Sequence, residues 1–171
     1  PLGRWRPGFL SLRWAQTQSL SKVERGFQAV VLDTPSPSGA IHSCHKQPVG
    51  SRLARGALAT AYERADLKAS AAVGGATLAQ DRQRLTVWVA NASGLIVRDR
   101  LGFEVLAGKS SDMTSWRWYS APILTTDGLQ TLTLSLANVL SRGANGTVDT
   151  HPFAASRVVA VRYLWANSPC S

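Results

Sequence analysis

The chain has 171 residues, 44% of them hydrophobic, so it can bury a core, and its length suits one or two small domains. Its formal net charge of +9 comes mostly from arginines scattered singly along the chain. No basic block or aromatic motif indicates nucleic-acid binding, and no apolar run approaches the roughly 20 residues of a membrane-spanning helix.

The first predicted element is the apolar run FQAVVLD, from Phe27 to Asp33. A continuous run of this kind is typical of a strand buried on both faces, as in a parallel sheet covered by helices. The turn-forming stretch PSPSGA follows it. A helix comes next, because one helical stripe collects Val49, Leu53, Ala54, Ala57, Leu58, Ala61 and Tyr62. Strand, loop and helix together make half of an α/β unit.

After KASAAVGGATLAQDRQ the hydrophobic period changes to two, in residues 85–90 and again in 131–136. GFEVLAG, SWRWYS and RVVAVRYLW add short strands separated by turn residues. Such spacing predicts a β-sandwich or a similar all-β module. We therefore expect an α/β region in residues 1–66, followed by a β-rich, sandwich-like domain in residues 67–171.

His42 lies in the loop between the predicted strand and the helix, where open α/β sheets place their ligands. An imidazole titrates near neutral pH, so His42 is a candidate general base. Asp33, at the end of the strand, is the nearest upstream acid that could orient it. The alternative is a histidine that caps the helix or is hydrogen-bonded within the loop.

Other chemistry in the same loop is less favoured. Asp33, His42 and His45 could supply three metal ligands, but zinc sites usually need a second ligand pair, and His151 is distant in sequence. Cys44 beside two histidines could be a nucleophile, but neighbouring loop residues rarely face a common point. We expect neither a metal nor a cofactor. No Gly-x-Ser-x-Gly or Gly-Asp-Ser stretch supplies a serine nucleophile.

Aromatic residues and modification sites complete the candidates. Trp116 and Trp118 flank Arg117 in a strand pattern, so they share one face and Tyr119 lies on the other. They could form a platform for sugar rings, although such a pair more often packs in a core. Two N-glycosylation sequons begin at Asn91 and Asn145. The two cysteines, Cys44 and Cys170, allow at most one internal disulfide.

Several motifs, in collinear order, resemble the sialate O-acetylesterases. They are the arginine–glutamine motif Arg13-Trp14-Ala15-Gln16, the strand ending in Asp33, Ile41-His42, Lys46-Gln47, the helix start from Val49 to Arg52-Leu53, and the closing VVAVRYLWANSPC. FEVLAG and the segment from Trp116 to Ala121 fit the region between them more loosely. The resemblance therefore spans nearly the whole chain.

The resemblance implies an SGNH-type α/β hydrolase fold, of which residues 1–66 are the C-terminal end, with a β-rich accessory domain. It also implies removal of an O-acetyl ester from sialic acid or a related glycan by a serine–histidine mechanism. By that likeness His42 takes the proton from the serine and returns it to the departing sugar oxygen, and Asp33 is the candidate orienting carboxylate. With the sequons, it implies a secreted or lysosomal full-length protein.

The sequence also departs from the family pattern. Ser43 replaces a proline after the histidine, His45 replaces an aspartate, and Gly39 stands where many SGNH enzymes have a carboxylate. The N-terminal portion that carries the nucleophile is absent, so we expect a C-terminal fragment that is inactive alone. The alternatives are a carbohydrate-binding β module, a catalytically inactive relative, and an enzyme acting on acetylated plant or microbial polysaccharide.

Overall fold

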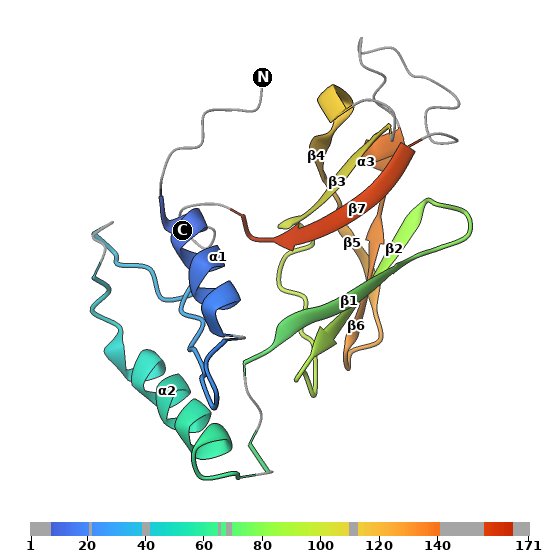
Figure 1. The fold of residues 1–171 in the computed structure, drawn as a ribbon. Coiled ribbons are helices and arrows are strands. Elements are labelled where there is room, and N and C mark those ends of the chain that lie inside the picture. The colour runs from blue at the N-terminus through green and yellow to red at the C-terminus, as the bar shows by residue number, and fades with distance from the viewer. Residues whose placement is uncertain are drawn as a thin grey trace. The chain divides into compact units, whose positions relative to one another are not determined.

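The computed structural model describes residues 8–20, 22–38, 42–64, 66–67, 70–109, 113–140 and 156–165. The chain separates into two compact units (Figure 1). Unit 1 comprises Pro1–Ser70 with Trp165–Ser171, and unit 2 comprises Ala71–Leu164. The division therefore falls close to the point where the hydrophobic period changes. No described helix is long and apolar enough to cross a membrane.

Unit 1 contains two helices, α1 (Phe9–Leu20) and α2 (Lys46–Thr60). The hydroxyls of Thr17 and Ser19 donate to carbonyls one turn earlier in α1, at 3.0 and 2.7 Å. Trp165 also belongs to this unit, and its ring packs edge-to-face against Trp14 with the centroids 6.5 Å apart. The last part of the described chain thus packs onto the middle of α1.

The predicted strand at Phe27–Asp33 is wrong for this structure, because the segment pairs with no strand of the described chain. Val30 and Val31 are 41% and 40% exposed instead of buried on both faces. The physical reason is that a strand is defined by hydrogen bonds to a neighbour, and the described part of unit 1 supplies no neighbouring strand. The segment is apolar, as the sequence shows, but it belongs to no sheet of the described chain.

The predicted helix is confirmed as α2, which begins three residues before Val49. Its buried face differs from the predicted stripe: Leu53, Leu58 and Tyr62 are 45%, 37% and 73% exposed, whereas Gly56 is buried. A Cβ added at Gly56 would lie 2.3 Å from Cδ2 of Phe27, so this helix position fits against the aromatic ring only as glycine. The contact between Phe27 and Gly56 joins the apolar segment Phe27–Asp33 to α2.

Unit 2 consists of two antiparallel sheets (Figure 1). The four-stranded sheet has the order β1 (Ala72–Leu78), β2 (Arg84–Ala90), β6 (Thr131–Ser135) and β5 (Ile123–Thr126). The three-stranded sheet has the order β4 (Arg117–Ser120), β3 (Phe103–Lys109) and β7 (Ser156–Tyr163). Two short helical segments, η1 (Met113–Ser115) and α3 (Ala137–Leu140), complete the described elements of the unit.

One hydrophobic core lies between the two sheets of unit 2. Alternate residues point into it, as in β6, where Leu132 and Leu134 are buried between half-buried neighbours. Val87 of β2 and Val105 of β3 are fully buried in the same cluster, so both sheets contribute to one core. Two antiparallel sheets of short strands thus share one core, and the described chain combines helices with antiparallel sheets.

Two strands of unit 2 were not predicted from the sequence. β1 lies within the small-residue stretch KASAAVGGATLAQDRQ, which precedes the change of hydrophobic period. All seven of its residues are exposed, and it forms an edge of the sheet. Gly74 is the extra residue of a β-bulge in β1, and a Cβ there would lie 2.3 Å from the ring of Trp88. β5 has only four residues, which is too short for a period to show.

The turn between β5 and β6 is organised by one carboxylate. Oδ1 of Asp127 accepts hydrogen bonds from the backbone N–H groups of Leu129, Gln130 and Thr131, at 2.8 to 2.9 Å. These bonds hold the pKa of Asp127 well below its ordinary value, and the bond from Thr131 has the largest effect. Gly128 occupies a positive φ of 73° in the same turn, where an L side chain would be strained.

Candidate functional site

The loop that precedes α2 carries the candidate base. His42, Cys44 and His45 are all exposed, and the His42 imidazole forms no hydrogen bond or ion pair with any described residue. Ser43 fixes the local backbone, because its hydroxyl accepts from the N–H of His45 at 3.1 Å and donates to the carbonyl of Pro35 at 3.4 Å. His42 is therefore presented outward from a loop that is tied down beside it.

Asp33 binds Arg52 of α2 through both carboxylate oxygens. Nη1 of Arg52 lies 2.6 Å from Oδ1, and Nη2 lies 2.7 Å from Oδ2. Nη1 also donates to the carbonyl of Val30 at 2.8 Å. The hydrogen bonds to Asp33 raise the pKa of the Arg52 guanidinium above its ordinary value. One guanidinium thus joins the apolar segment Phe27–Asp33 to α2.

The structure does not join the two residues predicted to work together. No hydrogen bond or ion pair links Asp33 to His42 within the described chain, and the Asp33 carboxylate faces Arg52. Arg52 was missed as a site residue, although it belongs to the helix-start motif, because a guanidinium reveals its partner only when the chain is folded. The catalytic roles of His42 and Asp33 stay predictions.

The loop also holds an exposed free thiol at Cys44. The other cysteine, Cys170, lies outside the described residues, as does His151. In the described part of the chain, no three histidine, cysteine, aspartate or glutamate side chains come together as a metal site. The side chain of His45 does not cap α2, although the residue occupies the N-cap position.

The aromatic pair lies in unit 2, on the face of the three-stranded sheet opposite the core. Trp118 pairs with Leu106 of β3, while Tyr119 pairs with the fully buried Val105 and packs against the core. The prediction that the tryptophan pair packs in the core is therefore wrong for Trp118, which is 36% exposed. The register decides this, because alternate residues of a strand point to opposite faces.

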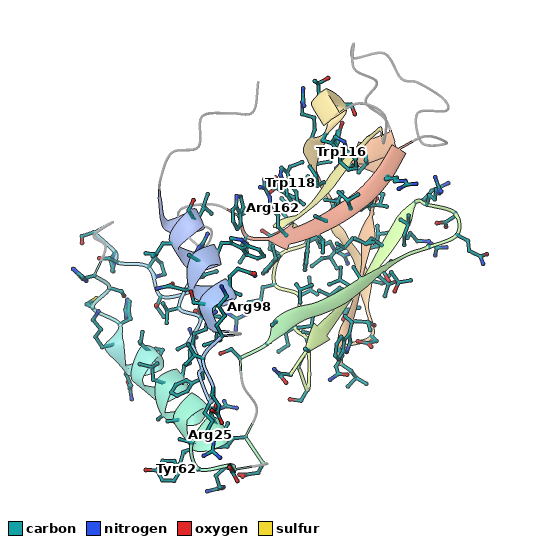
Figure 2. The ribbon with its side chains drawn as sticks, viewed as in Figure 1. Arg25, Tyr62, Arg98, Trp116, Trp118 and Arg162 are labelled. Atoms are coloured by element: carbon teal, nitrogen blue, oxygen red, sulfur yellow. The ribbon has the colours of Figure 1, made fainter. Side chains whose placement is uncertain are left out.

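An arginine covers the ring of Trp118 (Figure 2). The guanidinium carbon of Arg162 lies 3.9 Å from the ring centroid, and its Nε donates to Glu104 at 2.7 Å. Strand register explains the meeting, since Arg162 of β7 is opposite Glu104 of β3. A glycan contact at Trp118 would have to compete with this stacked cation.

Trp116 precedes β4 and lies over Gly108, where an added Cβ would come 2.8 Å from its Cα. Its indole Nε1 is buried without a hydrogen-bond partner among the described residues. The glycan-binding role of Trp116 and Trp118 stays a prediction. So does glycosylation: Asn91 is exposed directly after β2, with a positive φ of 61°, whereas Asn145 lies outside the described residues.

Comparison with known proteins finds relatives over nearly the whole chain. Sialate O-acetylesterase from Rattus norvegicus is 31% identical over 172 residues, and the match covers 95% of this chain. Sialate O-acetylesterase from Mus musculus is 32% identical over 183 residues, with the same coverage. The chain is a relative of the sialate O-acetylesterases. No protein-family model matches the sequence.

The fold comparison agrees with this relationship. A crystal structure of a carbohydrate acetylesterase from Xanthomonas citri superposes with a TM-score of 0.64 at 25% sequence identity, covering 94% of this chain. The chain spans 28% of the length of the rat and mouse sialate O-acetylesterases and 32% of the bacterial enzyme. The resemblance carried by the sequence motifs is thus confirmed over the residues that this chain contains.

Proposed function

We propose that this chain is the histidine-bearing C-terminal portion of a carbohydrate O-acetylesterase that removes acetyl esters from sialic acids or related glycans. The observation that carries the proposal is the match to sialate O-acetylesterases over 95% of the chain, including the loop that presents His42. An exposed imidazole without a partner in the described chain is available to a serine hydroxyl and a substrate.

The proposed reaction assigns one proton to His42. A serine supplied by the remainder of a longer protein attacks the acetyl carbonyl, and the His42 imidazole accepts the hydroxyl proton. The imidazolium then donates that proton to the sugar oxygen as the ester bond breaks, which leaves an acetyl-serine. Water repeats the sequence and releases acetate. The orienting acid in this proposal is Asp33, acting while it is also held by Arg52.

The same proposal assigns each unit to a domain of the longer protein. Unit 1 supplies the C-terminal end of an SGNH-type α/β hydrolase domain. Unit 2 is the β-rich accessory domain. The exposed Val30 and Val31 support the first statement, because large apolar side chains left exposed are suited to burial against the remainder of a larger domain. A secreted or lysosomal location, with glycans at Asn91 and Asn145, belongs to this proposal as well.

The test begins with native source material treated with a fluorophosphonate serine probe. Recovery of a larger protein that contains these peptides and is labelled on an upstream serine is expected. In that protein His42→Ala lowers the rate of acetyl release about 10⁴-fold or more, whereas His45→Ala, in the same loop, changes it little. An unlabelled protein of 171 residues, or a small effect at His42, contradicts the proposal.

A further inference from the structure

Arg52 connects the two ends of the loop that carries His42. Its guanidinium binds Val30 and Asp33, which lie before the loop, while its backbone belongs to α2, which begins directly after the loop. Three hydrogen bonds of 2.6 to 2.8 Å converge on this one side chain. Arg52 therefore ties the segment before the loop to the helix that follows it.

The contact between Arg52 and Asp33 fixes the relative position of two segments more than it stabilises the fold. Arg52 and Asp33 have side chains that are 34% and 59% exposed, and ion pairs at such positions contribute little to the free energy of unfolding. A bidentate arginine–carboxylate pair does fix geometry, because the planar fork allows only one alignment of the two groups. The additional bond to the Val30 carbonyl removes the remaining freedom to rotate about that pair.

We infer that Arg52 is a positioning residue for His42: through Asp33 and the Val30 carbonyl it holds the start of the loop at a fixed place relative to α2. The inference rests on the proposed function for the reason why His42 must be held in place. The contacts of Arg52 themselves do not depend on that function. In this arrangement Arg52 influences the imidazole only by fixing the backbone on either side of it.

The test uses the intact 171-residue chain and needs no substrate. Arg52→Gln is expected to speed amide hydrogen exchange in residues 42–45 by about tenfold and to shift or broaden the ring signal of His42 in ¹H–¹³C spectra, while exchange in residues 53–60 of α2 is unchanged. Arg55→Gln is the matched control on the same helix, since Arg55 is exposed and forms no hydrogen bond or ion pair among the described residues.

Two further variants keep the inference falsifiable. Arg52→Lys keeps the charge but lacks the fork, so it is expected to loosen the loop as Arg52→Gln does. Asp33→Asn leaves Arg52 in place and removes its anionic partner, and it is expected to give the same loop-specific change. Wild-type exchange and ring signals in all three variants overturn the inference. If the longer protein has no acetylesterase activity, only the proposed function is contradicted. The positioning role of Arg52 is tested separately, because amide exchange and the His42 ring signal do not depend on hydrolysis.

Discussion

At Gly56, α2 comes so close to Phe27 that the presence or absence of one carbon atom decides the contact. Gly50 lies on the same helix and has open space around it, with no atom within 4 Å of an added Cβ. Both glycines lower the intrinsic stability of a helix interior, by about 1 kcal/mol each relative to alanine. Only at Gly56 is this cost offset by a close approach.

The two positions therefore predict opposite responses to the same substitution. Gly56→Ala is expected to lower the free energy of unfolding of unit 1 by about 1–3 kcal/mol, because the ring of Phe27 must move away. Gly50→Ala is expected to raise it by about 0.5–1 kcal/mol. Urea unfolding followed by far-ultraviolet circular dichroism measures both. Equal effects of the two substitutions would show that the Phe27 contact is not tight in solution.

At the scale of elements, β1 depends on its neighbour more than on its own sequence. All its residues are exposed, and its central Gly74-Gly75 pair has weak strand preference. Trp88 of β2 covers Gly74, whereas a Cβ at Gly75 would meet nothing within 4 Å. The indole Nε1 of Trp88 reaches Gln130 at 3.5 Å, so the ring has a defined place on the sheet.

Adjacent glycines again supply a matched pair. Gly74→Ala is expected to displace the Trp88 ring, shifting its indole N–H signal and lowering the stability of unit 2 by roughly 1 kcal/mol. Gly75→Ala is expected to leave that signal in place. The measurement is a ¹H–¹⁵N spectrum of each variant with the six tryptophan indoles assigned. If both variants leave the Trp88 signal unmoved, the packing of the ring on Gly74 is contradicted.

These elements show what the sequence could predict. β2 and β6 were predictable because Leu85, Val87, Leu132 and Leu134 occupy every second position, between residues that are mostly polar, and burial follows that alternation. β1 was not, since small residues carry no period. The strand predicted at Phe27–Asp33 is wrong, because apolar composition indicates a tendency to be buried but does not show that a partner strand is present. The helix and His42 loop were predictable locally, whereas the pairing of Arg52 with Asp33 joins distant positions that no local pattern connects.

At the scale of the whole molecule, the buried hydrophobic residues of the described chain all lie in unit 2, from Leu85 to Val139. In unit 1, the sole buried position among the described residues of its helices is Gly56. Hydrophobic burial is the main source of stability, so the two units should differ in how readily they open.

Hydrogen exchange of the intact chain tests this difference. Amides of β2, β3 and β6 are expected to exchange slowest, and those of residues 22–38 fastest, because the latter have few buried contacts and no strand partner in the described chain. Mass spectrometry of peptides after timed labelling resolves the two regions. Comparable protection in both would mean that unit 1 is stabilised by contacts beyond those described.

The packing of Trp165 against Trp14 has a consequence for the order of events during synthesis. Unit 1 is discontinuous in sequence, so the ribosome must complete all of unit 2 before the indole that closes against α1 emerges. Proteins usually fold from the N-terminus as domains appear. Here α1 must wait for a residue that is synthesised after all of unit 2, whereas the β-rich unit, whose sequence is uninterrupted, can finish folding first.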